Sequence, residues 1–540
     1  MAAERFDVIV LGSGIAGLSA ALAAAHMGLR PVLLEKAERI GGITVHSYGI
    51  MWVGCNHLAQ ACGLADDRND VIGYMRFIGG GQIAEDKMLA FVDRAPEALR
   101  FFSQCGIAFR LIGSLPDHYF GTAPGSRGAG RSLETELIAG NELGRWRERV
   151  LMPDAPAFVT LEEQIRWGGI NAVSQWDQTL IAERKSKDLC GKGLGLVLHF
   201  LKALLACDVP IRTGQSVERL LVEEGRVAGV VMASGEAIAS RKGVAIATGG
   251  YHANPDLVRE YEGLPGVLEE PSSLAPPSIT GDGLILAGEI GAVIRKVENN
   301  LKLQLAYTIP PEKPGALLTC VHAGIVELCS PHTLVVNREG RRFADETFFQ
   351  GMVPRLRDYD ALKRVYPNLP AFLIFDSQYP ERYSFANRPA GSNVPASVAR
   401  EDSLSALAAT LGIDAVGLEA TVKRFNAFAE QGIDADFHRG ESQWRLAGGG
   451  GSSGNTSLGP IERPPFYGVR LQPTNSNSTG LLTGAHGEVM HQRRLSIPGL
   501  YASGYVAAPT ESGVGYQAGT LIAASMTFSY LAARHMLGLS

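Results

Sequence analysis

The sequence predicts a protein of the mixed α/β class, in which a parallel sheet carries a glycine-rich turn and a second domain is inserted into the chain. Three observations predict this class. A buried strand at residues 6–11 leads into glycines at GxGxxG spacing, a second strand ends at Glu35, and the pattern changes between about residues 293 and 430. At 540 residues, the chain is long enough for two or more domains with a large core.

The first strand, FDVIVL, is followed by Gly12, Gly14 and Gly17. Gly12 permits a tight turn, Gly14 lets the backbone approach a pyrophosphate, and Gly17 lets the helix predicted at residues 18–27 pack closely on the sheet. The N-terminus of that helix presents unpaired N–H groups to the phosphates. Because the motif follows a strand and opens a helix, it predicts dinucleotide binding rather than an ordinary glycine turn.

The second strand, PVLLEK, places Glu35 18 residues after Gly17, where an acid can bond a ribose hydroxyl. This stretch alone does not separate FAD from NAD. Gly41 and Gly42 follow directly and favour FAD, because flavoproteins use a second glycine-rich contact there. In the next stretch, His46 and Tyr48 are either flavin contacts or core residues.

Composition excludes several classes of function. The net charge of −5 and pI of about 6.2 leave no basic footprint for nucleic acid, and the 64 glycines fit a backbone that approaches a large cofactor at many points. The seven cysteines form no CxxC pair, so we expect no metal site and reduced thiols. The first strand begins near residue 6 and no run of 18 apolar residues appears, so we expect no signal peptide, no transmembrane segment and a cytoplasmic location.

The middle of the chain alternates between helices, strands and one long loop. We expect helices at 57–62, 68–78, 85–105 and 193–206, short strands across 209–239, and a glycine- and proline-rich loop at 113–132. Loops on a rigid scaffold often carry substrate contacts. The strand at 242–251 ends in Thr248, Gly249 and Gly250, a second approach to the dinucleotide, and Asp282 lies in the first turn of a further helix.

An inserted block begins near residue 293, and a flexible linker at 448–455 returns the chain to the first domain. The final section begins at Pro464, with a strand at 499–506. The segment 513–519 feeds the last helix, expected at 520–537, and offers a third set of backbone N–H groups to the flavin or a substrate oxygen.

These pieces in this order resemble the fumarate reductase/succinate dehydrogenase flavoprotein superfamily. The pieces are GSGIAG, Glu35, Gly41-Gly42, ATGG, TGDG, VNREGRRFADE and GLYASG. The resemblance implies a glutathione-reductase-like Rossmann domain of the two-dinucleotide-binding type that binds FAD, formed by residues 1–285 and 450–540. An α+β catalytic domain at 286–449 would be inserted between them.

The site motifs of the fumarate and succinate enzymes are absent. No HPT motif follows TGDG, Gln350 stands where one family arginine falls, and Tyr516 stands near the place of a second. Because a dicarboxylate is best held by bidentate cationic donors, their absence argues against such a substrate. The histidine that carries covalent flavin in succinate dehydrogenase maps to about Gly42, so we expect non-covalent FAD.

The sequence is more similar to the 3-ketosteroid Δ1-dehydrogenase branch. The matching stretches are GIMWVGCNH, LPDHYFGTAPGSRGAGRSLE, LGPIERPPFYGV and SMTFSYLAARHM. The resemblance implies that Tyr119 is a site tyrosine and that Tyr516 and Gly519 hold a ketone oxygen. The turn YQAG is one residue shorter than the family pattern, so Gly515 takes the tyrosine position if the helix register is kept. A third family tyrosine falls at about Gln350.

This resemblance implies removal of two hydrogens beside a ketone. The Gly519 N–H and Tyr516 hydroxyl would polarise the ketone oxygen, a tyrosine base would take the α-proton, and flavin N5 would accept the β-hydride. Tyr119 is the best candidate for the proton transfer. The alternative is that its ring only packs over the mouth of the pocket. For Tyr516 the alternative is core packing, and for Gly519 a simple helix-start role.

We expect Tyr48, Phe120, Phe349 and Gln350 to contact the substrate. The expected cofactor contacts are Gly12, Gly14, Ile15, Ala16, Gly17, Glu35, Lys36, Gly41, Gly42, Ile43, Thr44, Ser47, Tyr48, Gly49, Val217, Ala247, Thr248, Gly249, Gly250, Asp282, Gly504, Tyr505, Gly519, Thr520 and Leu521.

Three functions follow as hypotheses. The first is an FAD-dependent oxidoreductase of CH–CH bonds, a dehydrogenase of apolar ring ketones of the 3-ketosteroid kind, placed in steroid and lipid metabolism. The second is an ene reductase of another, non-dicarboxylate enone. The third is a flavin-binding, redox-responsive protein without turnover. Because the chain has no haem-binding CxxCH motif or FMN-attachment segment, an external electron acceptor or donor is expected.

Overall fold

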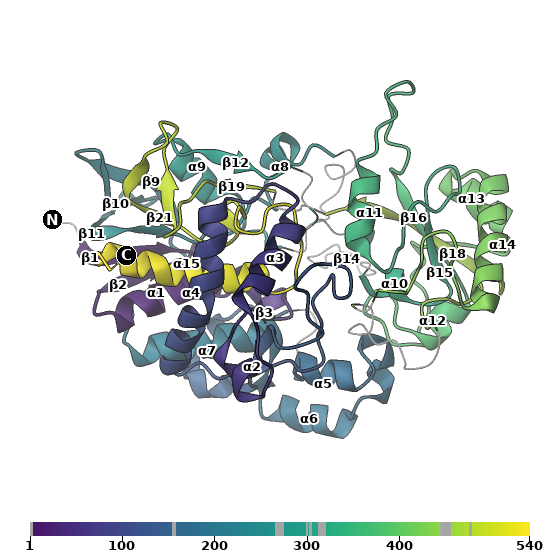
Figure 1. Cartoon of the computed structure of the whole chain (residues 1–540), viewed down its shortest axis with the longest axis horizontal. Helices are drawn as coiled ribbons and strands as arrows, with labels where there is room; N and C mark the ends of the chain where they lie inside the picture. Colours follow the sequence, from purple (N-terminus) through teal and green to yellow (C-terminus); the bar gives the residue numbers. More distant parts are fainter. Residues whose placement is uncertain are drawn as a thin grey trace.

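The computed structural model describes residues 4–153, 158–264, 275–298, 301, 305–310, 320–323, 325–442, 444, 455–474 and 478–539. Figure 1 shows two lobes. Both termini lie in the lobe that contains the N-terminal sheet, and a second sheet with its own helices forms the other lobe.

The N-terminal sheet has eight strands and follows the order β20-β21-β11-β1-β2-β8, with β10 paired to β11 and β9 to β10. Strand β1 runs parallel to both β2 and β11, and β11 runs parallel to β21. Its strands are β1 (Glu4–Leu11), β2 (Pro31–Leu34), β8 (Ile211–Arg212), β9 (Val217–Glu223), β10 (Arg226–Met232), β11 (Ala237–Ile246), β20 (Glu488–Met490) and β21 (Ser496–Ala502). The predicted α/β class is confirmed.

Strand β1 is buried on both faces, as a central parallel strand must be. Val8 and Val10 join the core cluster on one side of the sheet, and Ile9 and Leu11 join the cluster on the other side. Successive side chains of a strand point to opposite faces, so this one apolar strand contributes to the hydrophobic clusters on both sides of the sheet. The first side is covered by α1 (Ile15–His26), α4 (Glu85–Gln104), α7 (Lys192–Ala206) and α15 (Thr520–Met536).

The second sheet has six strands, all paired antiparallel, in the order β14-β13-β18-β16-β15 with β17 paired to β18. Helices α13 and α14 cover one of its faces (Figure 1). Its elements are β13 (Leu305–Ile309), β14 (Cys320–Ala323), α10 (Ile325–Cys329), β15 (Thr333–Val336), α11 (Phe349–Leu356), β16 (Ala371–Asp376), α12 (Gln378–Arg382), β17 (Ala399–Glu401), α13 (Leu404–Leu411), α14 (Ala415–Gln431) and β18 (Phe466–Pro473).

Strand β18 lies in a stretch that the sequence analysis assigned to the cofactor domain from residue 450. The structure pairs it with β13, β16 and β17 instead. The reason is burial on two faces: Phe466 joins the cluster with α13 and α14, while Leu471 joins the opposite cluster. The chain returns to the N-terminal lobe at β19 (Thr479–Leu481), which pairs with β12 (Ile294–Lys296). Most of the linker expected at 448–455 lies outside the described residues.

The remaining elements frame the loops beside the N-terminal sheet. The helices expected at 57–62, 68–78 and 85–105 are observed as α2, α3 and α4, and residues 158–187 contain helices that the sequence analysis did not assign. These elements are η1 (Gly42–His46), β3 (Met51–Trp52), α2 (His57–Ala61), α3 (Arg68–Gly79), β4 (Phe109–Leu111), β5 (Ser132–Thr135), β6 (Ile138–Ala139), η2 (Gly140–Arg149), α5 (Leu161–Arg166), η3 (Ile170–Gln175), α6 (Gln178–Ser186), β7 (Leu189–Cys190), α8 (Pro255–Tyr261), α9 (Asp282–Gly288) and η5 (Gly504–Val506).

In the described part of the chain, no helix combines the length and the apolar character needed to cross a bilayer.

Candidate active site

The turn from β1 into α1 depends on two glycines. Gly12 has a φ of +101°, and a Cβ there would lie 2.4 Å from the carbonyl oxygen of Ala247 on the neighbouring strand segment. A Cβ on Gly17 would lie 1.8 Å from the carbonyl oxygen of Gly12. No side chain fits either position, so helix α1 packs directly on the turn and its N-terminus opens at the carboxyl end of the parallel strands.

Glu35 closes this end of the sheet. One carboxylate oxygen accepts hydrogen bonds from the Ser13 backbone N–H at 2.9 Å and from the Ser13 hydroxyl at 2.6 Å. The other oxygen accepts from the Ala37 N–H at 2.8 Å. Beside it, Lys36 forms an ion pair with Asp282 at 2.7 Å, which ties the end of β2 to the start of α9. The acid is therefore held rigidly where the two strands end.

A cavity of about 500 Å³ begins at this turn and reaches the C-terminal segment before α15. Nearly all the expected cofactor contacts line it. The exceptions are Gly17, Gly41, Gly250 and Thr520. Gly17 serves the helix packing described above, and Gly41 adopts a φ of +119° while its N–H donates to the Ser13 hydroxyl at 3.1 Å.

The cavity suits a dinucleotide. Its walls combine the glycine turn, the opening of α1 and the carboxylate of Glu35 with the backbone of the segments 42–50 and 247–249. These are the groups that pyrophosphate and ribose require. Gly42 lines the cavity with no side chain, and a Cβ at this position would lie 3.8 Å from Gly14.

The C-terminal turn forms another wall, from Tyr516 to Gly519. Gly519 has a φ of +91°, its carbonyl oxygen accepts a hydrogen bond from the Trp52 N–H at 3.1 Å, and a Cβ would lie 2.7 Å from the Trp52 nitrogen. This contact fixes the start of α15 against strand β3. Burial raises the pKa of the Tyr516 hydroxyl, so it is a neutral donor at physiological pH.

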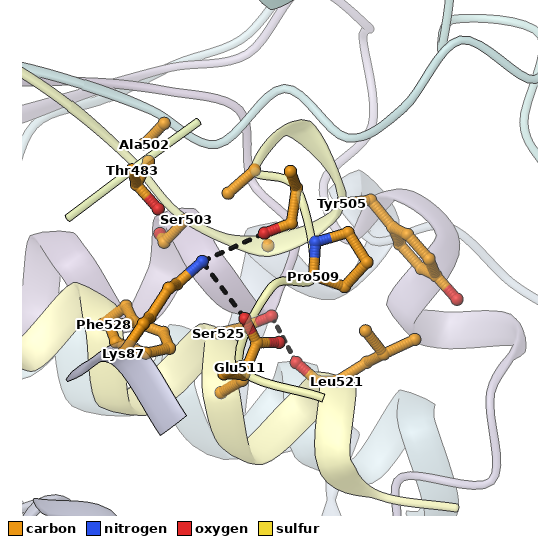
Figure 2. A pocket seen from close by; sticks show the side chains of 14 residues that line it. Lys87, Thr483, Ala502, Ser503, Tyr505, Pro509, Glu511, Leu521, Ser525 and Phe528 are labelled. Carbon is orange, nitrogen blue, oxygen red and sulfur yellow. Dashed lines mark hydrogen bonds and ion pairs between the residues drawn. The ribbon is translucent and has the colours of Figure 1, made fainter. Parts of the chain in front are cut away.

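A small pocket of about 20 Å³ adjoins this wall and shares Gly504, Tyr505, Leu521 and Ser525 with the main cavity. Figure 2 shows Lys87 reaching across it to Glu511, which lies 3.1 Å away, and to the Ala508 carbonyl oxygen at 3.0 Å. Both charged side chains are almost fully buried. The ion pair thus anchors the segment before the C-terminal turn to helix α4.

His118 also lines the cavity, although it was not among the predicted site residues. Its backbone N–H donates to Gln517 Oε1 at 2.9 Å, and its ring lies 3.5 Å from the Trp444 ring and 5.0 Å from the Tyr516 ring, centroid to centroid. Ring atom Nδ1 lies 2.8 Å from Nε2 of Gln350. The other ring nitrogen, Nε2, is buried and has no hydrogen-bond partner among the described residues. Burial lowers the pKa of His118 well below 6.5, so the imidazole is neutral.

Unlike His118, the neighbouring Tyr119 does not face the cavity. Its ring packs edge-on against Phe77 and Phe348, at centroid distances of 5.8 and 5.3 Å, and it does not line the cavity. A tight turn causes this, because the Phe120 N–H donates to the Asp117 carbonyl oxygen at 3.1 Å and successive side chains point in different directions. Burial raises the pKa of Tyr119 to about 12.

The expected substrate contacts are only partly brought together. Tyr48 lines the cavity, whereas Phe120 does not and lies against Gly128. Gln350 reaches the site indirectly, through His118. The side chain of Phe349 lies outside the described part of the structure.

The loop that carries His118 is held by Asp117. This buried carboxylate accepts hydrogen bonds from Trp52 Nε1 at 2.7 Å, from Arg131 at 2.9 Å and from the Arg127 N–H at 2.8 Å. Arg131 is 1% exposed and also binds Asp66. The sequence analysis missed His118, Trp444 and Gln517. Only His118 had a signal, as a titratable residue inside the loop chosen for substrate contacts.

Comparisons with known proteins identify the family to which the chain belongs. A family model described as an FAD binding domain matches residues 7–519. The 4-oxocyclohexanecarboxylate 2-dehydrogenase of Sinomonas cyclohexanicum is 34% identical, with 99% of this chain and 93% of that protein covered. The 3-oxosteroid 1-dehydrogenase of Mycobacterium tuberculosis is 31% identical, with 99% of each covered. A crystal structure of 3-ketosteroid Δ1-dehydrogenase from Sterolibacterium denitrificans, in complex with 1,4-androstadiene-3,17-dione, has a TM-score of 0.87 at 26% identity and covers 99% of this chain and 100% of its own.

Proposed function

The chain belongs to the FAD binding domain family and is an oxidoreductase of the steroid dehydrogenase and fumarate reductase group of flavoproteins; from that premise we propose that it dehydrogenates an apolar ring ketone at the carbons next to the carbonyl. The two relatives named above carry names that describe dehydrogenation of a ring ketone. The proposal extends that chemistry to this chain.

One observation carries the proposal: the charge distribution along the cavity. Among the described residues that line it, carboxylate, lysine and arginine side chains are confined to Glu35 and Lys36, directly after β2, and Asp282, at the start of α9. The wall near the C-terminal turn consists of apolar, aromatic and neutral polar side chains, such as Trp444, Tyr516 and Ile522. A dicarboxylate would need paired cations there, whereas a ketone needs only neutral donors.

Under this proposal, different residues of the cavity bind the cofactor and the substrate. Glu35 bonds a ribose hydroxyl, and the glycine turn with the opening of α1 binds the pyrophosphate. The FAD is held non-covalently, since Gly42 offers no side chain for attachment. When bound, the flavin accepts the hydride that leaves the β-carbon.

The Gly519 N–H and the Tyr516 hydroxyl hold the ketone oxygen and stabilise the negative charge that develops on it. Tyr48 and the ring of Trp444 orient the substrate in the cavity. The proton-acceptor role considered for Tyr119 is not carried forward, because its ring packs between Phe77 and Phe348.

The test is an anaerobic titration of the purified flavoprotein with 4-oxocyclohexanecarboxylate, 4-androstene-3,17-dione and fumarate. We expect one of the ring ketones to bleach the oxidised flavin and fumarate to leave the dithionite-reduced flavin unchanged. Reoxidation of the reduced enzyme by the enone 4-androstene-3,17-dione, without bleaching of the oxidised enzyme by either ring ketone, would support the ene reductase instead. No response to any ketone or enone would overturn the proposal.

A further inference from the structure

The proposed function needs a group that takes a proton from the α-carbon, and the structure offers one that the sequence analysis did not consider. His118 lines the cavity, and its Nε2 atom is buried there without a partner among the described residues. A buried polar atom left unpaired costs free energy, on the order of 1–3 kcal/mol. Such an atom in a native site calls for a function or a ligand.

The other side of the ring is held in place. Gln350 lies 2.8 Å from Nδ1, and Gln517 fixes the backbone of the same residue at 2.9 Å. A glutamine amide can present either nitrogen or oxygen to this contact after a half-turn. Oε1 of Gln350 has no partner among the described residues, so nothing there opposes the orientation in which Oε1 accepts from Nδ1–H. In that orientation, Nε2 carries a free lone pair on a side chain that lines the cavity.

The tyrosines of the cavity are poorer bases. Burial raises the pKa of Tyr505 to about 12 and raises that of Tyr516 as well, so the tyrosinate form is rare at neutral pH. A buried histidine is neutral in the same surroundings and accepts a proton without first losing one. Among the described residues around His118, the titratable or charged groups are Tyr516 on the C-terminal turn, Tyr74 of α3 through Gln517, and the Asp117–Arg131 pair of its own loop.

We propose that His118 Nε2 is the catalytic base and that Gln350 is a positioning residue that holds Nδ1–H. This inference rests on the proposed function. In the step, the bond between the α-carbon and its hydrogen breaks, the proton forms a bond to Nε2, and the electron pair stays on carbon to become the new double bond. The hydride from the β-carbon goes to the bound flavin, which is the oxidant. The imidazolium returns its proton to solvent after the product leaves.

The first experiment measures α-proton exchange without turnover. Holoenzyme kept reduced with dithionite cannot accept a hydride, so deuterium uptake by the ketone substrate in D₂O reports proton transfer alone. The probe is whichever of 4-oxocyclohexanecarboxylate and 4-androstene-3,17-dione bleaches the wild-type flavin. We expect His118→Gln to slow exchange and turnover together by about 10²- to 10⁴-fold.

The control is His199→Gln, which changes another buried histidine, on α7, whose Nε2 bonds the Glu136 carbonyl oxygen at 3.0 Å. The His199→Gln variant should exchange the α-proton of the ketone at the wild-type rate. The flavin spectrum and content of both variants show whether they fold. If His118→Gln loads FAD, binds the ketone and still exchanges at the wild-type rate, the inference fails while the proposed function stands. If no ketone bleaches the wild-type flavin, the proposed function itself fails.

The second experiment separates a base from a hydrogen-bond donor by pH profile. Gln350→Glu places a carboxylate on Nδ1, which forces Nδ1–H and raises the pKa of the imidazole. For a base, activity persists and its loss on acidification moves to higher pH. If Nε2–H were instead a donor to the ketone oxygen, the neutral ring of the same variant would lack that hydrogen, so activity would be lost at neutral and alkaline pH and return only where acid protonates the ring; that profile would overturn the proposal.

Discussion

At the scale of single residues, positions with positive φ mark where the backbone itself builds the site. Gly519 combines a φ of +91° with a contact in which a Cβ would lie 2.7 Å from the Trp52 nitrogen. Gly28 has a similar φ of +82°, but nothing lies within 4 Å of its Cβ position. Substituting alanine at each of these two glycines therefore separates the free-energy cost of the backbone conformation from the cost of displacing a neighbouring atom.

We expect Gly519→Ala to destabilise the protein by about 2–4 kcal/mol, since left-handed strain of about 1–2 kcal/mol is joined by the overlap with Trp52. It should also reduce kcat, because the N–H proposed to hold the ketone oxygen shifts. Chemical denaturation and steady-state kinetics measure both effects. Gly28→Ala should cost only the strain and leave kcat unchanged; equal effects of the two variants would contradict this account.

The pH dependence of turnover is also a property of one residue. His118 must be neutral to accept a proton, and burial lowers its pKa well below 6.5. Activity should therefore be level through neutral pH and fall only as acidification protonates the ring below that lowered pKa. The initial rate of flavin bleaching against pH measures this, and a rate that keeps climbing toward pH 10 would indicate a tyrosine base instead.

At the scale of elements, α15 carries the C-terminal turn, and the ion pair of Figure 2 determines how the preceding segment is held. Lys87 on α4 is 2% exposed and Glu511 is 3% exposed. Removing one partner of a buried ion pair leaves an uncompensated charge, whereas replacing both with apolar residues is often tolerated. The pair thus links helix α4 to the segment that precedes α15, which lies far away in sequence.

We expect Lys87→Met to destabilise the protein by about 3–5 kcal/mol and to weaken ketone binding, because Glu511 would be left buried and unpaired. The double variant Lys87→Met, Glu511→Leu should recover most of the stability. A double-mutant cycle in urea measures the coupling. If the two single effects simply add, the pair does not act as a unit.

At the scale of the whole molecule, the cavity joins segments from both ends of the chain: the first glycine turn, the loop at 42–50 and the C-terminal turn. We propose a cofactor domain that includes the N-terminal sheet together with β12 and β19, and a second domain built on the sheet that contains β18. Under this proposal, the boundaries lie near residues 298 and 478 rather than 285 and 450.

Because the cofactor would bridge segments from both ends of the chain, FAD should stabilise the whole fold. At a concentration 100-fold above its dissociation constant, a ligand that binds only the native state adds about 2.7 kcal/mol. We expect the melting temperature of apoprotein to rise on adding FAD and to stay constant on adding NAD. Acid precipitation of holoprotein should release free FAD, and flavin that stays with the pellet would contradict non-covalent binding.

Local patterns by themselves determined the cofactor end of this protein. The strand–glycine–helix turn, Glu35, the strand before Thr248 and the helix that opens at Asp282 are all encoded by neighbouring residues, and the structure contains each of them. Backbone conformation and strand burial depend on residues close in sequence, so these elements could be predicted from the chain alone.

Only the tertiary structure decided the part of the cavity where we propose that the ketone binds. His118, Gln350, Trp444 and Gln517 come from four separate segments, and their contacts depend on how the loop at 113–132 turns above the sheet. A one-residue difference in that turn exchanges Tyr119 for His118 at the cavity wall, and no local pattern encodes it. The same holds for β18, whose membership of the second sheet follows from burial on two faces by residues far away in sequence.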